Sequence, residues 1–158
     1  MSVPAGGISQ PQQSRRSRHV LAAQHRMRTS VQFSETTRSG VRAGRRNVVL
    51  YAHRGPSDSP TLCGFIVSKA VGNAVTRNKV KRRLRTLARE AIQQHPLGLR
   101  LVIRALPASA HTEYSQLATE VRSAWGTLER KLKRSHGTAA DLTRSDHRTM
   151  QCMSTETP

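Results

Sequence analysis

The sequence has few acidic residues for its size. Nine Asp and Glu accompany 27 Lys and Arg in 158 residues, so the formal net charge is +18 and the isoelectric point lies near 11.8. This imbalance does not define a fold, but it indicates a polyanionic partner, with nucleic acid as the first candidate and an anionic membrane surface as the second. The scarcity of carboxylates also argues against metal-dependent phosphodiester cleavage by the protein itself, because that chemistry needs clustered acids.

Cysteines, long apolar runs and metal-binding patterns are also scarce. Cys63 and Cys152 form neither a disulfide framework nor a metal motif, which fits a reducing compartment. No stretch is long and apolar enough to span a bilayer, and no apolar run follows Arg15, Arg16 and Arg18 as it would in a signal peptide. The seven His form no H-x-x-x-H pair and no set with Cys. We therefore expect a cytoplasmic protein without membrane association, metal ligands or catalytic residues of its own.

The two ends of the chain differ in composition from its middle. Residues 1–19 are rich in Ser, Gln, Gly, Pro and Arg without periodicity, and residues 135–158 are polar with many Ser and Thr. Both segments are predicted to be disordered tails, the N-terminal one basic. A single folded domain is predicted over residues 20–134.

The first half of this domain combines one helical and two extended segments. Ser30 is a plausible N-cap for a short helix, and Gly40 is a plausible stop. Residues 47–53 and 61–68 are apolar and rich in β-branched side chains, so both are predicted to be strands. The turn-rich loop 54–60 between them makes an antiparallel arrangement the simplest one.

The second half predicts two helices around a strand. A long helix is expected from about residue 73 to 94, because Pro96 and Gly98 follow it, and a strand is expected at 99–105. Thr112 is a plausible cap for a final helix. Apolar residues recur there at intervals of three and four and should form a core stripe, made of Tyr114, Leu117, Val121, Trp125, Leu128 and Leu132.

The long helix has an apolar face and a cationic face. Six Lys or Arg occur between Arg77 and Arg85 without an acid, and Glu90 alone interrupts the cationic face. A solvated face normally mixes both signs, so this one is predicted to contact nucleic-acid phosphates. Asn78 can also bond a base edge, a ribose hydroxyl or a metal-bound water. At 100° per residue, Val80, Leu84, Leu87, Ala88 and Ala91 form the apolar face, and Asn78, Arg82, Arg85 and Arg89 lie opposite, with Lys79, Lys81 and Arg83 at the margins.

Residues 68–85 resemble the signature of the protein subunit of bacterial ribonuclease P, which is close to S-K-x-x-G-N-A-V-x-R-N-R-x-K-R-x-x-R. Here the segment reads SKAVGNAVTRNKVKRRLR, and the resemblance extends over about residues 21–132. It implies an α+β domain in the order αβββαβα, with a central, mainly antiparallel sheet and an extra short strand around residues 41–45. It further implies that the basic helix lies in a left-handed βαβ crossover, against the usual right-handed rule.

The resemblance also implies a division of labour. A ribonuclease P RNA subunit, bound in a 1:1 ribonucleoprotein, performs the endonucleolytic removal of the 5′ leader from precursor tRNA, with Mg²⁺ bound mainly by the RNA and the substrate. A cleft between the sheet and the N-terminal helix, with Phe33, Tyr51 and Ser68, should hold the leader, and ring stacking tolerates any base. The predicted RNA-binding residues are Lys69, Asn73, Arg77, Asn78, Lys79, Lys81, Arg82, Arg85 and Arg89.

Three residues depart from the family pattern. A second aromatic residue, usual one helical turn after Phe33, is Thr37 here, so one stacking surface is missing. The third position of the R-N-R triplet is Lys79, and a basic residue common after Lys69 is Ala70. We expect the same site with weaker or shifted leader contacts. Core packing remains the alternative interpretation for Phe33 and Tyr51.

Other functions are compatible with the charge and size of the chain. A structural RNA-binding protein, such as a ribosomal component, is the main alternative. A DNA-binding or nucleoid protein and a stand-alone nuclease are the others. The sequence indicates no protein partner.

Overall fold

The computed structural model describes the backbone of residues 21–149 and the side chains of residues 21–135. The predicted N-terminal tail, residues 1–19, lies outside the described residues, and so do residues 150–158 of the predicted C-terminal tail. Within residues 135–149 of that C-terminal segment, the chain continues as a helix. The order αβββαβα is the expected one. The elements are α1 (Ser30–Ser39), β1 (Val41–Gly44), β2 (Val48–Arg54), β3 (Leu62–Ile66), α2 (Ala74–Gln94), β4 (Leu99–Ala105) and α3 (Tyr114–Thr149), with short 3₁₀ turns η1 (Ala23–His25), η2 (Lys69–Val71) and η3 (Pro107–Ala110).

Four strands form one mixed sheet in the order β1-β2-β4-β3. The pairs β1/β2 and β2/β4 are antiparallel, and the pair β4/β3 is parallel, so the sheet is mainly antiparallel as expected. Helix α2 joins the two parallel neighbours β3 and β4. Strands β2 and β3 run in opposite directions, as predicted, but they do not pair, because β4 lies between them.

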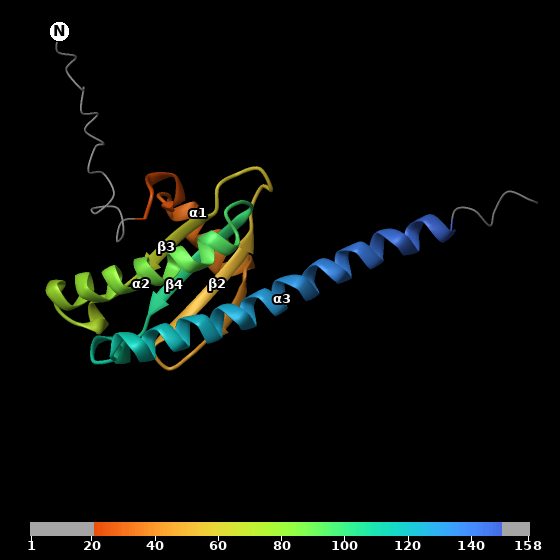
Figure 1. Ribbon diagram of the computed structural model, residues 1–158. Helices are drawn as coiled ribbons and strands as arrows, with labels where there is room; N and C mark the ends of the chain where they lie inside the picture. The colour runs from red at the N-terminus through yellow and green to blue at the C-terminus, as the bar shows by residue number, and fades with distance from the viewer. Residues whose placement is uncertain (1–20, 150–158) are drawn as a thin grey trace, which may run out of the picture.

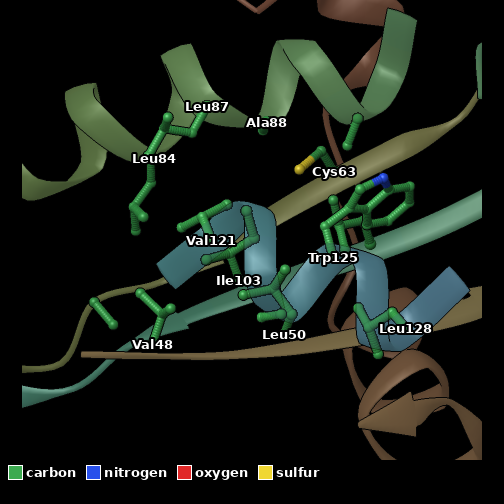
Figure 2. Close-up of a cluster of buried hydrophobic side chains, with 14 of the residues drawn as sticks. Val48, Leu50, Cys63, Leu84, Leu87, Ala88, Ile103, Val121, Trp125 and Leu128 are labelled. Atoms are coloured by element: carbon green, nitrogen blue, oxygen red, sulfur yellow. The ribbon is translucent and has the colours of Figure 1, made fainter. Parts of the chain in front are cut away.

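The helices cover the two faces of the sheet unequally. Helices α2 and α3 lie on one face and α1 lies on the other (Figure 1). Leu84 of α2 and Val121 of α3 point into the same apolar layer above Leu50 and Ile103 of the sheet (Figure 2). The main core therefore lies between the sheet and α2 with α3, and its burial fixes both helices on that face.

The N-cap of helix α1 lies one residue earlier than the sequence suggested. Thr29, not Ser30, is the N-cap, because Thr29 has an extended backbone and its hydroxyl accepts from the Gln32 N–H at 3.3 Å, while the Gln32 side chain accepts from the Thr29 N–H. Gly40 ends the helix as predicted. A Cβ there would lie 2.3 Å from the Thr36 carbonyl oxygen and 2.7 Å from that of Ala52, so only glycine permits this close approach of α1 to β2.

Helix α3 carries the predicted apolar stripe with one exception at its start. Tyr114 is 40% exposed, so the buried stripe begins at Leu117 and includes Val121, Trp125 and Leu128. Thr112 is not a cap for α3. Its hydroxyl donates instead to the Asn47 side-chain oxygen at 2.9 Å and to the Ala108 carbonyl at 2.8 Å.

Polar contacts join α3 to α2. The Trp125 indole N–H donates to the Gln94 side chain at 2.8 Å. Glu90 accepts from both Nε and Nη2 of Arg122, at 2.9 and 2.8 Å, and this hydrogen bonding lowers the pKa of Glu90. The one acid on the cationic side of α2 is therefore directed towards α3 and neutralised there.

Candidate nucleic-acid interface

The Gly72-Asn73 pair sets the start of the basic helix. Gly72 has a φ of +151°, a conformation that side chains disfavour, and it ends the η2 turn. Asn73 then caps α2, with its side-chain oxygen accepting from the Thr76 N–H at 2.9 Å. This capping hydrogen bond gives Asn73 a structural role. Helix α2 thus begins at a defined point, which fixes the position of the cations that follow.

The two predicted faces of α2 are confirmed. The residues of the predicted apolar face, together with Ile92, are buried against the sheet and α3. Asn78, Lys79, Arg82 and Arg85 are exposed on the outer side. Lys81, Arg77 and Arg89 are half-buried. Since an apolar back holds the helix in place, its outer cations form a rigid row.

Two arginines at the borders of this row differ in their bonding. Arg83 is engaged within the protein, because its Nη1 donates to the Thr112 carbonyl at 2.8 Å. The Nε of Arg77 is buried and has no hydrogen-bond acceptor among the described residues. An unmet buried donor costs free energy, so the Nε of Arg77 is a local destabilising feature at the border of the helix.

Two arginines of the outer row, Arg82 and Arg85, are not paired with acids of the described residues. Glu90 pairs with Arg122, Glu35 with Arg100 and Glu129 with His95. The side chains of Arg82 and Arg85 make no hydrogen bond or ion pair with the part of the chain that the structure describes. Both guanidinium groups are therefore available to phosphate, whose geometry matches their planar fork.

A second predicted group lies on the opposite face of the sheet, under α1. The ring of Phe33 lies directly on Gly64 of β3, because a Cβ at Gly64 would be 2.4 Å from the Phe33 Cε1. Gly64 pairs with Val102, which pairs with Tyr51. Phe33 and Tyr51, both half-buried, therefore belong to one sheet face. Ser68 is exposed and follows the end of β3, at the start of the turn that carries the exposed Lys69.

Thr37 does not replace the missing second ring. Its hydroxyl donates to the Phe33 carbonyl at 2.9 Å and to the Ser34 carbonyl at 3.1 Å. This residue is thus bonded to the backbone of its own helix. The aromatic surface of this face is smaller than the family pattern implies.

Two arginines on this face, Arg100 and Arg104, were not among the predicted site residues. In β4, Leu101 and Ile103 face the core, so alternation places Arg100 and Arg104 on the side of α1. Arg104 is exposed, and Arg42 of β1 pairs with Tyr51 and is exposed as well. The strand alternation that marked the core residues of β4 was the signal that could have found Arg104.

The described residues offer little for metal or thiol chemistry. No group of three or more His, Cys, Asp and Glu is arranged to hold a metal ion in this part of the chain. Cys63 is buried, and burial raises the pKa of its thiol, so it is unreactive packing material. Among residues 21–149, no helix has the length and apolar character needed to cross a bilayer.

Gly64→Ala tests the seat of the Phe33 ring. The added methyl group must displace the ring from the sheet, so we expect a loss of about 1–3 kcal/mol in the free energy of unfolding, as in overpacked cores. Gly44→Ala is the matched control, because a Cβ there meets nothing within 4 Å. Urea denaturation of both variants measures the difference, and equal stabilities would contradict the placement of the ring.

The fold and the two surfaces define a small α+β protein of the nucleic-acid-binding class. The chain belongs to the ribonuclease P protein family, whose model, described as Ribonuclease P, matches residues 21–129.

Relatives and solved structures agree with this assignment. The chain is 54% identical over 112 residues to a ribonuclease P protein component of Kocuria rhizophila, covering 71% of this chain and 98% of that protein. It is 52% identical over 113 residues to one of Arthrobacter sp. strain FB24, covering 72% and 83%. The fold matches the RNase P proteins of Staphylococcus aureus (TM-score 0.58, 23% identity, 65% of this chain and 94% of that chain) and Thermotoga maritima (TM-score 0.55, 20% identity, 66% and 96%).

Proposed function

We propose that this chain is the protein component of ribonuclease P. It binds the RNA subunit and the 5′ leader of precursor tRNA and aids endonucleolytic removal of the leader, which makes the mature 5′ end of the tRNA. The observation that carries this proposal is the rigid row of exposed cations on α2, in which Arg82 and Arg85 have no partner among the described residues, in a chain of this family. Nothing observed favours a ribosomal component.

In this proposal the RNA subunit performs the cleavage and the protein supplies affinity and position. Mg²⁺ is held mainly by the RNA and the substrate. The cations of α2 sit against the RNA and reduce the repulsion between two polyanions, so less Mg²⁺ is needed for assembly. Asn78, which is exposed, supplies hydrogen bonds at the same contact, and Arg77 adds its charge at the border of the row. The further RNA contacts are those predicted for Lys69, Asn73, Lys79, Lys81 and Arg89.

The leader lies on the sheet face under α1. Phe33 and Tyr51 provide rings on which bases of any sequence can stack, and Ser68 lies at the end of β3 beside the first cations. Stacking that tolerates any base suits an enzyme whose substrates carry different leaders. The protein acts in the cytoplasm as part of a soluble ribonucleoprotein.

Reconstitution tests the proposal. The purified protein is mixed with its cognate ribonuclease P RNA and a precursor tRNA at low Mg²⁺, and cleavage at the leader junction is measured. We expect strong stimulation over the RNA alone and no cleavage by the protein alone. A structural RNA-binding protein would not stimulate, and a stand-alone nuclease would cut without the RNA subunit.

Tyr51→Ala should weaken leader binding selectively. Loss of one stacking ring costs about 1–3 kcal/mol, so affinity of the holoenzyme for precursor tRNA should fall by roughly 5- to 150-fold. Tyr51→Phe keeps the ring and serves as the control. Affinity for mature tRNA should be unchanged in both variants, and an equal loss for precursor and mature tRNA would place Tyr51 outside the leader site.

A further inference from the structure

The sheet face that carries Tyr51 is only partly covered by α1. Three rows of paired residues cross this face. One row, Leu62, Arg100 and His53, lies towards α1, which is tied to it by the ion pair of Arg100 with Glu35. The middle row is Gly64, Val102, Tyr51 and Arg42. The third row, Ile66, Arg104, Val49 and Gly44, lies on the far side of Tyr51, and its Arg104 and Gly44 are exposed.

Two arginines flank Tyr51 on the open part of this face. Arg42 is directly opposite Tyr51 across the β1/β2 pair. Arg104 pairs with Val49, two residues from Tyr51, and is therefore its diagonal neighbour across the β2/β4 pair. Directly opposed residues have Cβ atoms about 5 Å apart and diagonal ones about 7–8 Å, which is within reach of long side chains. Both guanidinium groups can therefore reach the backbone of a nucleotide stacked on Tyr51.

Neither arginine is engaged within the described part of the chain. The side chains of Arg42 and Arg104 make no hydrogen bond or ion pair there, whereas the third arginine of this face, Arg100, is paired with Glu35. The ammonium group of Lys131 donates to the backbone carbonyl of Arg42, which brings another cation to the β1 edge. The uncovered part of this sheet face therefore carries positive charge, at Arg42 and Arg104, that no described acid neutralises.

We propose that Arg104 and Arg42 bind phosphates of the precursor's 5′ leader beyond the nucleotide stacked on Phe33, and that they guide the leader across the sheet to the β1 edge. This rests on the proposed function and names residues that the family signature does not supply. The two arginines share a sheet face with Phe33 and Tyr51, while α2 packs on the opposite face. A single-stranded leader therefore fits them better than the RNA subunit does.

The topology also sets an order along the leader. Ser68 and Lys69 follow β3, at one edge of the sheet, and the strands from there are β3, β4, β2 and β1. A strand of RNA that enters beside Ser68 meets the ring of Phe33, which belongs to α1 and lies over Gly64 of β3. It then meets Arg104 on β4, Tyr51 on β2 and Arg42 on β1. Arg42 should accordingly bind phosphates farther from the cleavage site than Arg104. Phosphate contacts by these two arginines also compensate for the stacking surface that is missing because Thr37 stands in place of a second aromatic residue.

The test measures binding by the reconstituted holoenzyme to precursor tRNAs whose leaders lengthen from one to about ten nucleotides. The double variant Arg104→Gln/Arg42→Gln should lose about tenfold in affinity for the longest leader and none for the one-nucleotide leader. The slope of log affinity against log salt should fall by roughly 1.4, since each single-strand phosphate contributes about 0.7. The matched control Arg54→Gln/Lys133→Gln removes two cations that line a hollow beside Trp125, on the α3 side, and should change neither quantity.

The single variants test the order. Arg104→Gln should first show its loss at a shorter leader than Arg42→Gln. An unchanged affinity of the double variant, a loss that is equal with the one-nucleotide leader, or the reverse order of the single variants would each overturn this inference. Failure of the proposed function itself is recognised separately, because the unmodified protein would then not stimulate cleavage.

Discussion

The variant Arg82→Gln/Arg85→Gln is expected to bind ribonuclease P RNA about 100-fold more weakly or worse than the unmodified protein. Each exposed guanidinium can make charge-assisted hydrogen bonds of about 1.5–3 kcal/mol to phosphate, and the structure offers neither arginine a partner within the described chain. The salt dependence should flatten by roughly 1.8, because each phosphate contact on a duplex contributes about 0.9. Titration of the fluorescently labelled RNA at several salt concentrations measures both quantities.

The same substitution should raise the Mg²⁺ concentration needed for half-maximal cleavage. The pair Arg54→Gln/Lys133→Gln again removes two positive charges without touching α2, so it controls for net charge alone. If both double variants lost affinity equally, long-range attraction would explain RNA binding, and the fixed row on α2 would have no special role.

Leu84→Ala is expected to destabilise the fold by about 2–5 kcal/mol, through lost transfer free energy and a residual cavity. Leu84 has 0% exposure and lies in the core between α2 and the sheet (Figure 2). Small domains have total stabilities of about 5–15 kcal/mol, so this loss is a large share. Urea denaturation followed by circular dichroism measures it.

Leu97→Ala provides the comparison for this prediction. Leu97 lies between α2 and β4 and is 55% exposed, so its truncation should change stability by no more than about 0.5 kcal/mol. Equal destabilisation by the two substitutions would mean that α2 does not depend on its apolar back. The cations of α2 would then lack the rigid support assigned to them.

Local patterns predicted the elements of this fold well. The strand at 99–105 has the predicted bounds, and α2 starts within one residue of its predicted start, because Asn73 and Pro96 mark its ends chemically. The predicted N-cap of α1, Ser30, is one residue later than the observed N-cap, Thr29. Thr29 and Ser30 carry equivalent hydroxyls, and only the backbone conformation of Thr29 distinguishes them.

Features that depend on distant parts of the chain were harder to predict. The insertion of β4 between β2 and β3 is a pairing across many residues, and the composition of the two earlier strands carries no trace of it. Periodicity placed Arg83 near the cationic margin, but the Thr112 carbonyl that holds it comes from a loop 29 residues away. By contrast, the position of Arg104 follows from simple alternation, because Leu101 and Ile103 of the same strand face the core.

The central place of β4 affects how the chain is made as well as how it is held. On the ribosome, β2, β3 and the whole of α2 are synthesised before residues 99–105 exist. Until then β2 and β3 have no strand between them to pair with. The apolar face of α2 can bury only part of its surface at that stage. The sheet closes last at its middle, through contacts distant in sequence, which are slow to form. A nascent chain therefore exposes its most cationic segment before the domain can restrain it, at a site crowded with ribosomal RNA.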